Sequence, residues 1–579
     1  MNNQEQCEQA KLIEQAKLID MHQVSYYPII RAYMQRIGLV ELVNTLVGGE
    51  MTSKPGLIVA GMIQGTLSGR TSLYDLQDSF DEQDTELLLG EYVDPSVFQD
   101  HNVERVLDRI EDVGPGKIFG EIARQAAVVF NIDTSAGHWD STSFSVWGCY
   151  SNCPEGNIDQ SYDNSEDQQS DLKQFILSIL CVEQNIPIIG ETQDGSSSDK
   201  TLNNKLLTRI GKKLAKHRLK EGAFTYVADS AVFTDQNLAC FDPIPESASL
   251  YFVARLPHNH KETGRAINEA VLTNQWQEIG ELATSHPSAS RPQASYKSFE
   301  TKVELYDKTY RAIVIHSSAH DKRRQKRIDR EIEQARKDLS KAITKHGKPY
   351  FACRTDAEKH CRNLHSIPMP YHTLQTRIEE KVQYAQGKQP KNGSRKVVDR
   401  RWIVQTEIVE LPEKIDLKRA EADCFVLITN RPTQGADAKT SKELLQSYKA
   451  PDGIERNIKF MKDPLIVNDL FLKKPQRIEA LGMILLLALL IWNLIQRQMR
   501  LHLAETKSTI EGLNQRQTDR PTSYAMTTKF RYILILRMNH KRILKNPLSS
   551  TQHAYLKALG LTEEIFIDPK PPQKKQRKK

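Results

Sequence analysis

The hydrophobic positions of this chain change their spacing along its length, and each change predicts a different kind of element. From Met21 to about Phe130, apolar residues recur three and four positions apart, as in YYPIIRAYMQRIGLVELVNTLV, which predicts amphipathic helices. Pro55 and Pro95 stand where helices are expected to begin, and Gly114 stands where one should end. This part is therefore predicted to be a compact all-helical domain.

From Ala136 onward, polar and apolar residues alternate or form short apolar runs, which predicts strands. AGHWDSTSFSVWG alternates and places Asp140 within a strand, and LKQFILSILCVEQ and NIPIIGETQDG are expected to be its neighbours. An amphipathic helix is predicted from about Asp199 to Lys220, before a short buried strand, AFTYVAD, that ends at Asp229. This order predicts an α/β core with acids on its first and last strands.

The following residues depart from that simple order. KVELYDKTYRAIVIHSS predicts a two-strand hairpin, a charged helix follows from about Asp321 to His346, and WIVQTEIVEL and CFVLITN predict further strands. We interpret Pro257 to about Glu421 as a mixed β/α insertion with a basic helix, placed inside the core, which resumes at Ala422.

The stretch from Tyr448 to Arg500 combines an acid on a short amphipathic helix with the most apolar run in the protein. The run Ala480–Ile495 has two readings, a buried core helix and a membrane anchor. It has 16 residues and contains Gly482 and Asn493, whereas a bilayer span needs about 20 apolar residues. A core helix is the favoured interpretation, with a non-enzymatic, membrane-anchored protein as the alternative.

Length and composition are those of a multidomain globular protein. The 579 residues suggest about three or four units, and 39% hydrophobic and 26% charged residues are typical of soluble domains. The N-terminus has no basic-then-apolar signal pattern and the eight cysteines are scattered, which favours a reduced, cytoplasmic setting. The predicted divisions are a polar leader (1–20), the helical N-terminal domain (21–135), the first part of the core (136–256), the insertion (257–421), the second part of the core (422–505) and a C-terminal extension with a basic tail (506–579).

Charge is distributed unevenly around a net charge of +7. Residues 20–133 hold 18 acidic and 8 basic side chains, whereas six of the last ten residues are basic and DKRRQKRIDR forms a basic cluster at residues 321–330. Such clusters suit a polyanionic partner such as DNA. A solvated helix face and a disordered tail give the same pattern, so charge alone leaves both readings open.

Three acids are candidates for one metal site. A carboxylate within an apolar strand is costly unless it is paired or bound to a cation. Alone, Asp140 or Asp229 would be an ordinary strand or turn residue, but two acids on neighbouring strands indicate a shared function. Glu455 supplies a third carboxylate from a helix. Three oxygen donors suit Mg²⁺ or Mn²⁺, and two such ions about 4 Å apart can catalyse phosphodiester displacement.

The helix around Glu455 also carries cations. Lys459 and Lys462 follow Glu455 at four and seven residues, so the three share one face, where the lysines can reach DNA phosphates. An exposed Glu–Lys pair on any helix has the same spacing, and spacing alone does not separate the two readings. Cysteine pairs elsewhere lack the spacing of a zinc site, and no glycine-rich nucleotide loop is present, so neither zinc nor ATP is expected.

These motifs together resemble the bacterial insertion-sequence DDE transposases, in the branch whose catalytic Glu lies in a Tyr/Arg/Glu/Lys signature. Tyr448, Glu455 and Lys462 fit the signature's spacing, whereas Pro451 occupies the Arg position. The strands holding HWDSTSF and YVADSAVFT, and the run KDPLIVNDLFLKKPQRIEALGMILLLALLIWNLIQR, are also similar to this branch. The resemblance covers most of residues 20–500.

The resemblance implies an RNase H-like α/β core with a β-rich insertion between the second Asp and the Glu, preceded by an all-helical N-terminal domain. It implies that Asp140, Asp229 and Glu455 form the catalytic, metal-binding triad with two Mg²⁺ or Mn²⁺ ions. Tyr448 and Lys462 are implied to contact the DNA end.

The function implied is cleavage of DNA at the ends of an insertion element and transfer of the 3′-hydroxyl into target DNA. The expected partners are the terminal inverted repeats, target DNA and a second copy of the chain in the synaptic complex, in the bacterial cytosol at the nucleoid and without a membrane. Because Pro451 replaces the signature Arg, one phosphate contact is lost unless Lys449 or Arg456 substitutes. A catalytically weakened, DNA-binding relic is therefore the alternative.

Overall fold

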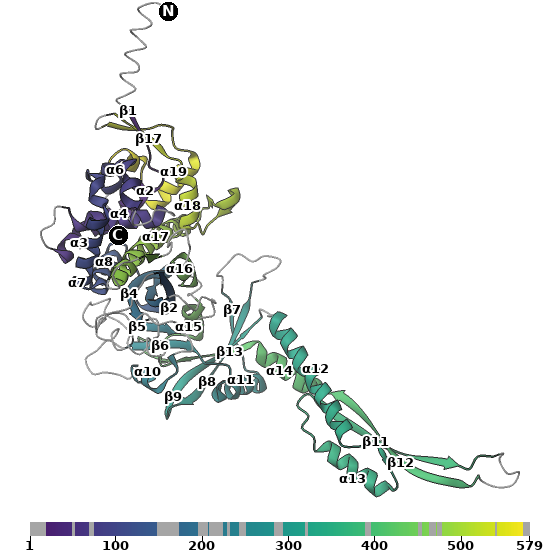
Figure 1. Cartoon of the computed structure of the whole chain (residues 1–579). Helices are drawn as coiled ribbons and strands as arrows, with labels where there is room; N and C mark the ends of the chain where they lie inside the picture. The colour runs from purple at the N-terminus through teal and green to yellow at the C-terminus, as the bar shows by residue number, and fades with distance from the viewer. Residues whose placement is uncertain are drawn as a thin grey trace, which may run out of the picture. The chain divides into compact units, whose positions relative to one another are not determined.

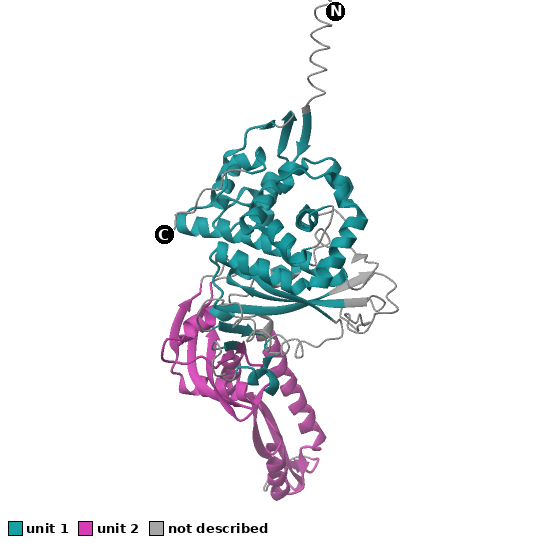
Figure 2. Ribbon diagram, turned by 90° about the vertical axis from the view of Figure 1, so that its left-hand side faces the viewer, with its two compact units in different colours: residues 1–253, 447–579 teal, residues 254–446 magenta. Residues whose placement is uncertain are grey.

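The structure is a computed structural model that describes residues 19–48, 53–68, 75–147, 173–194, 207, 224–228, 232–241, 250–282, 293–318, 322–387, 395–449, 454–461, 470–471, 477–538 and 541–570. The chain divides into two units, coloured separately in Figure 2. Unit 1 comprises residues 1–253 and 447–579, and unit 2 comprises residues 254–446. The finer domain boundaries expected from the sequence stay a prediction.

Helices make up the N-terminal part of unit 1, as the three- and four-residue periodicity predicted. They are α2 (Tyr27–Ile37), α3 (Leu39–Val47), α4 (Pro55–Ser68), α5 (Leu76–Asp81), α6 (Thr85–Leu89), α7 (Asp100–Val113) and α8 (Pro115–Val129). Pro55 begins α4, as expected, because its missing N–H needs no partner in a first turn. Gly114 ends α7 with φ +96°, a backbone region that glycine enters without steric cost.

A mixed sheet follows these helices, with strand order β4-β3-β2-β5-β6. Its strands are β2 (Ala136–Trp147), β3 (Lys173–Val182), β4 (Ile186–Asp194), β5 (Phe224–Ala228) and β6 (Leu250–Arg255), and unit 1 adds the short elements α10 (Asp235–Ala239), α16 (Ile454–Met461) and β14 (Leu470–Phe471). Strand β3 is antiparallel to β2 and β4, whereas β5 and β14 are parallel to β2. The strands predicted around Asp140 are therefore present. The helix predicted from Asp199 to Lys220 lies outside the described residues, apart from Leu207.

Helix α17 (Arg477–Thr506) packs against β4 and against the N-terminal helices of unit 1 (Figure 1). It is long and apolar enough to cross a membrane, with a mean hydropathy of 2.3 over its best window, but 89% of that window is buried inside the protein. Two glycines allow this close packing. A Cβ on Gly190 of β4 would meet Leu486 at 2.2 Å, and one on Gly482 would meet Thr192 at 3.2 Å. The apolar run is therefore buried, as the core-helix interpretation predicted.

The C-terminal segment of unit 1 packs on the N-terminal helices. Its elements are β15 (Ile510–Glu511), β16 (Gln517–Thr518), α18 (Ser523–Phe530), β17 (Leu534–Met538), β18 (Lys541–Leu544) and α19 (Ser550–Leu559). Strand β17 pairs with both β18 and β1 (Ile19–Gln23), so strands from the two ends of the chain share one sheet. Arg31 of α2 is 1% exposed and donates hydrogen bonds to the carbonyl oxygens of Ile565 and Asp568, at 2.9 and 3.1 Å.

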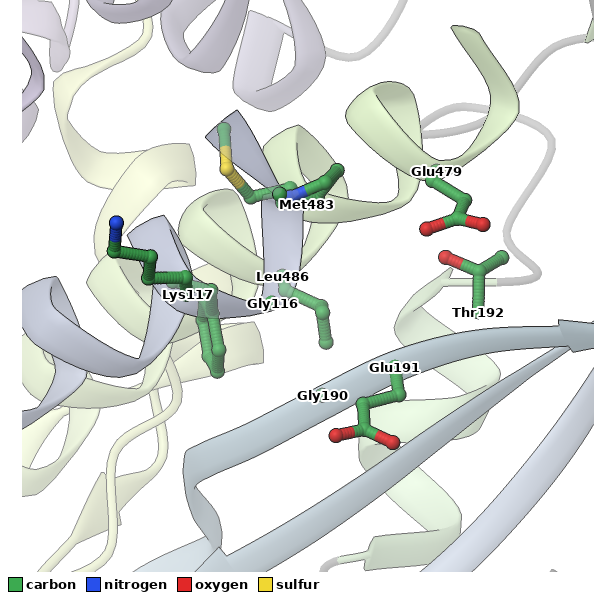
Figure 3. Close-up of a pocket in the computed structure, with 11 residues that line it drawn as sticks. Gly116, Lys117, Gly190, Glu191, Thr192, Glu479, Met483 and Leu486 are labelled. Carbon is green, nitrogen blue, oxygen red and sulfur yellow. The ribbon is translucent and has the colours of Figure 1, made fainter. Parts of the chain in front are cut away.

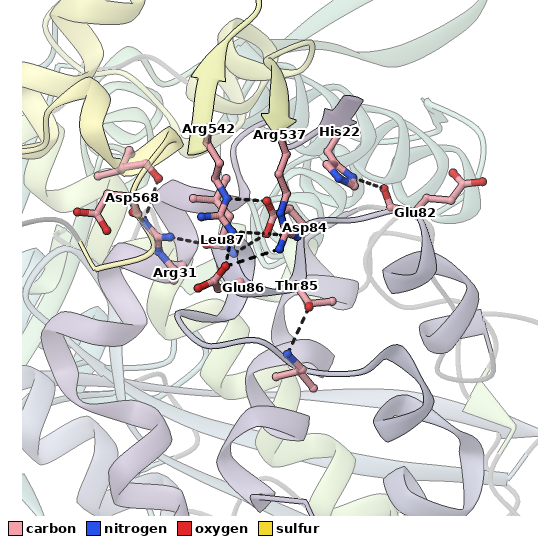
Figure 4. A network of polar contacts seen from close by, with 12 residues as sticks. His22, Arg31, Glu82, Asp84, Thr85, Glu86, Leu87, Arg537, Arg542 and Asp568 are labelled. Carbon is pink, nitrogen blue, oxygen red and sulfur yellow. Dashed lines mark hydrogen bonds and ion pairs between the residues drawn. The ribbon is translucent and has the colours of Figure 1, made fainter. Parts of the chain in front are cut away.

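A buried ion network also joins the two ends of unit 1 (Figure 4). Asp84 is 0% exposed, and its carboxylate accepts hydrogen bonds from Nε and Nη2 of Arg542 at 2.6 and 2.9 Å. Arg537 lies 3.5 Å from the same carboxylate, and Glu86 pairs with Arg542 at 2.6 Å. The N-terminal helices are therefore tied to the C-terminal strands by charged groups withdrawn from water.

Unit 2 contains strands in the order β13-β9-β8-β7 and a separate sheet in the order β10-β12-β11, all with antiparallel pairing. Its elements are α11 (Lys261–Thr273), β7 (Gln277–Glu281), β8 (Ser295–Leu305), β9 (Lys308–Ser317), α12 (Lys322–Lys345), β10 (Tyr350–Phe351), α13 (Arg354–His365), β11 (His372–Tyr384), β12 (Val397–Glu410), α14 (Pro412–Ala422), β13 (Cys424–Thr429) and, at its end, α15 (Ser441–Lys449). Strands β11 and β12 form a long hairpin whose apolar side packs on α13. Helix α12 matches the charged helix that the sequence predicted.

Candidate active site

Asp140 lies in the middle of strand β2, and its side chain is partly buried. Its Oδ1 accepts a hydrogen bond from the backbone N–H of Ser141 at 2.8 Å. Because side chains alternate along a strand, Asp140 shares one face of β2 with His138. In the register of the sheet, His138 lies opposite Cys181 of β3 and opposite Val227 of β5. Residues paired in this way present their side chains on the same face.

The second predicted acid, Asp229, lies outside the described residues. Strand β5 leads directly to it, because β5 ends at Ala228 and runs parallel to β2 with Val227 opposite His138. His138 and Val227 are register partners. In the sequence, Asp140 comes two positions after His138, and Asp229 comes two positions after Val227.

The third predicted acid belongs to helix α16. Glu455 lies in the first turn of this helix, and Lys459, one turn later, is exposed. Tyr448 is partly buried on helix α15. Lys462 and Pro451, the two remaining positions of the signature, lie outside the described residues.

Helix α16 is held on the sheet by the side-chain amide of Asn457, which is 3% exposed. Its Nδ2 donates hydrogen bonds to the carbonyl oxygen of Asn185 at 2.9 Å and to Sγ of Cys181 at 3.4 Å. Because Cys181 stands opposite His138, the second bond places α16 over the face of β2 that carries Asp140. Two of the three predicted acids therefore belong to elements that meet on one face of the sheet.

The buried groups beside Asp140 are uncharged near neutral pH. Burial is the largest cause that raises the pKa of the Cys181 thiol to about 12. The hydrogen bond from Asn457 lowers this pKa, and the negative charge of Asp140 raises it. Burial lowers the pKa of His138 to about 4, and its Nδ1 has no hydrogen-bond partner in the described part of the chain. Since neither group supplies positive charge, a cation bound on this face would stabilise ionised Asp140.

Among the described residues, no group of three or more His, Cys, Asp or Glu side chains is placed to hold a metal ion. This absence does not bear on Asp140, Asp229 and Glu455 as a group, because Asp229 and the side chain of Glu455 are not among the described residues. Cys353 caps helix α13, where its Sγ accepts a hydrogen bond from the N–H of Asp356. Cys361 belongs to the apolar core between α13 and the β11–β12 hairpin.

A pocket of about 310 Å³ lies between α8, β4 and α17 (Figure 3). Its polar lining includes Lys117, Glu191 and Glu479. Burial, and then the negative charges of Glu479 and Asp112, raise the pKa of Glu111 on α7 to about 7. Oε2 of Glu111 is buried without a hydrogen-bond partner among the described residues. The group of carboxylates beside this pocket can therefore take up or release a proton near neutral pH.

Replacing Glu111 by Gln is expected to stabilise the protein more at pH 8 than at pH 5. A carboxyl whose pKa is raised from 4.5 to about 7 on folding binds its proton more tightly in the native state. Its contribution to the free energy of unfolding is fully present below pH 4.5 and is lost as pH rises to 7. After allowance for partial exposure, the gain at pH 8 is about 1–2 kcal/mol. Urea unfolding at both pH values measures it.

The matched control is Glu505→Gln, the same change at an exposed position of α17. This control should leave the stability of the protein equal to that of the wild type at both pH values. An equal effect of Glu111→Gln at pH 5 and pH 8 would contradict the proton linkage.

Comparison with known proteins gives two findings. A family model described as a domain of unknown function (DUF4277) matches residues 19–124. The solved structure titled "Cryo-EM structure of piggyBac transposase synaptic complex with hairpin DNA (SNHP)" is similar at a TM-score of 0.32 and 10% identity, over 80% of this chain and 74% of that chain. No curated protein matches the chain.

Proposed function

We propose that this protein is a DDE transposase that cleaves DNA at the ends of an insertion element and joins the resulting 3′-hydroxyl to target DNA. The observation that carries the proposal is the placing of α16, with Glu455 in its first turn, over the face of β2 that bears Asp140. The parallel strand beside β2 leads directly to Asp229. Three antiparallel strands followed by a parallel one also support the RNase H-like core that the sequence resemblance implies.

The acids and the DNA-contacting residues of the candidate site would have separate roles. Asp140, Asp229 and Glu455 would hold two Mg²⁺ or Mn²⁺ ions, because carboxylate oxygens are the donors that these hard cations prefer. Bound there, the ions would supply Lewis-acid activation of the attacking oxygen and stabilise the leaving oxygen. Exposed Lys459, one turn from Glu455, would bind a phosphate of the DNA end, together with Lys462 and Tyr448.

The proposal is tested by incubating the purified full-length chain and Mn²⁺ with DNA that carries the sequences flanking its coding region. The expected result is cleavage at the two element boundaries, and transfer of the free 3′ ends into a second DNA. DNA binding without any cleavage would favour the alternative of a weakened relic, to which Pro451 in the Arg position points. Pairing of two ends requires at least a dimer, and the expected setting is the bacterial cytosol.

Helix α12 of unit 2 supports a DNA partner. Its buried side is formed by Ile328, Ile332 and Leu339. The opposite side carries a basic stripe, formed by the exposed residues Lys326, Arg330, Lys337 and Lys341. Their spacings of four, seven and four residues keep them in line over about 22 Å of helix. Such a row of cations on one side of a helix suits the phosphates of one DNA backbone.

Changing Arg330 and Lys341 together to Ala is expected to weaken binding of a duplex of about 40 base pairs roughly tenfold and to lower the salt slope by about 2. Fluorescence anisotropy over a range of salt concentrations, without metal, measures both. The control removes two exposed cations of α13, Lys359→Ala with Arg362→Ala. If both double variants lose affinity equally, the basic stripe of α12 has no special role.

A further inference from the structure

We infer that Asn457 and Asn493 form a carboxamide clamp that positions the helix of Glu455 over strand β2. The inference rests on the catalytic role proposed for Glu455. The two residues are positioning residues, because neither is proposed to touch metal or DNA. Their effect is transmitted through the placement of α16.

The clamp joins three elements through two side chains and one backbone carbonyl. Asn493 of α17 is 5% exposed, and its Nδ2 donates to Oδ1 of Asn457 at 3.0 Å and to the carbonyl oxygen of Asn185 at 2.9 Å. Asn457 donates to the same carbonyl at 2.9 Å and to Cys181. One carbonyl of the β3–β4 turn therefore receives two amide donors, one from α16 and one from α17.

The turn that offers this carbonyl is itself fixed by α17. Asn185 has φ +67°, the left-handed region that Asn tolerates better than most residues. Glu183, two residues earlier, is paired with Arg497 at 2.8 Å. Arg497 is 5% exposed, lies one helical turn beyond Asn493, and also donates to the carbonyl oxygen of Phe130 at 3.1 Å. Helix α17 therefore contacts the turn at two points, through Asn493 and through Arg497.

Directional bonds matter here because the other contacts of α16 have little directionality. Phe460 lies against Trp492 with ring centroids 5.1 Å apart, and Met461 is 1% exposed. Apolar packing tolerates sliding, and a slip of one residue along a helix shifts side chains by about 1.5 Å and rotates them by about 100°. A buried amide loses its partners in any other register, and each unsatisfied group then destabilises that register.

The clamp lies close to the candidate site. Cys181, which accepts from Asn457, stands opposite His138, and Asp140 follows His138 by two positions on the same face. Asn457 follows Glu455 by two positions. The geometry therefore points to a device that sets the distance between Asp140 on the sheet and Glu455 on the helix. Misplacement of a catalytic group by about 1 Å can lower a rate about 100-fold.

The test replaces Asn457 by Leu, which keeps the branched shape of the side chain and removes the hydrogen bonds. Three quantities are measured on the full-length chain: amide hydrogen exchange of α16 without metal, Mn²⁺ binding from the electron paramagnetic resonance signal of free Mn²⁺, and the kcat and KM of DNA cleavage. We expect faster exchange in α16, at least roughly tenfold weaker Mn²⁺ binding and about 100-fold lower kcat. The KM for DNA should change less than about threefold.

Met499→Ala is the control, because it removes a fully buried side chain of α17 without touching the clamp. It should lower the urea midpoint of unfolding but leave Mn²⁺ binding unchanged. Asn493→Leu should behave like the Asn457 variant. Wild-type Mn²⁺ binding and kcat in both Asn variants would overturn the clamp. If the wild type neither binds Mn²⁺ nor cleaves DNA, the proposed function fails, whereas the exchange of α16 still reports whether the clamp holds the helix.

Discussion

Replacing Asp140 by Asn is expected to abolish metal-dependent DNA cleavage while the protein stays folded. The change keeps the shape of the side chain, and Asp140 is only partly buried, so packing on strand β2 is preserved. The lost negative charge removes a ligand for a divalent cation on a face whose neighbouring His138 and Cys181 are uncharged. We expect a fall in kcat of at least roughly 1,000-fold, about 4 kcal/mol of transition-state stabilisation.

The measurement is cleavage of DNA that carries the element ends, with Mn²⁺, alongside the unfolding midpoint of each variant. Asp229→Asn and Glu455→Gln should give the same loss, because three groups that bind one metal pair act as a unit. Asp235→Asn, an exposed acid on α10, is the control and should cleave normally. Full cleavage by any one of the three variants would remove that residue from the triad.

The buried ion pair of Asp84 with Arg542 is expected to contribute to the stability of the protein. Replacing Asp84 by Asn is expected to destabilise the protein by about 3 kcal/mol, because it removes the fully buried carboxylate and leaves buried Arg542 with Glu86 alone as its charge partner. Arg542, whose side chain is 3% exposed, makes two hydrogen bonds to this carboxylate. Burial would raise the pKa of Asp84, but hydrogen bonds from Arg542 and from the N–H of Leu87 outweigh it and hold the pKa below its ordinary value.

Urea unfolding of the full-length protein measures this loss. The double variant Asp84→Leu with Arg542→Leu should recover part of the stability, since it leaves neither partner alone in the interior. Glu91→Gln is the control, because Glu91 pairs with Lys54 at an exposed site and should contribute less than about 1 kcal/mol. A loss below about 1 kcal/mol for Asp84→Asn would mean that the two ends of unit 1 are not joined by this network.

The sequence pattern predicted helices and strands better than it predicted which of them are in contact. The alternation in AGHWDSTSFSVWG and the apolar run of β3 predicted adjacent strands, because a buried sheet face forces these spacings locally. The contact of Asp84 with Arg542 joins positions 458 residues apart, and nothing in local periodicity relates them. For the same reason the pairing of β1 with β17 could not be foreseen.

The candidate site shows the same limit. Acids in strands and a helix could be picked from the sequence, because buried carboxylates are unusual. Asn457 does not stand out in the sequence, because the charged residues of α16 mark one face and an amide on the other side carries no signal of its own. In the sequence, Asn493 only interrupts an apolar run. A buried amide in such a run needs partners, which is a signal that sequence reasoning can use.

The central claim, that Asp140, Asp229 and Glu455 share one metal site, is tested most directly by a crystal structure of the full-length chain soaked with Mn²⁺. Anomalous scattering locates the metal independently of any activity. The account predicts Mn²⁺ about 2.0–2.3 Å from carboxylate oxygens of all three residues, on the face of β2 covered by α16. Manganese bound elsewhere, or no manganese between these carboxylates at a saturating concentration, would contradict it.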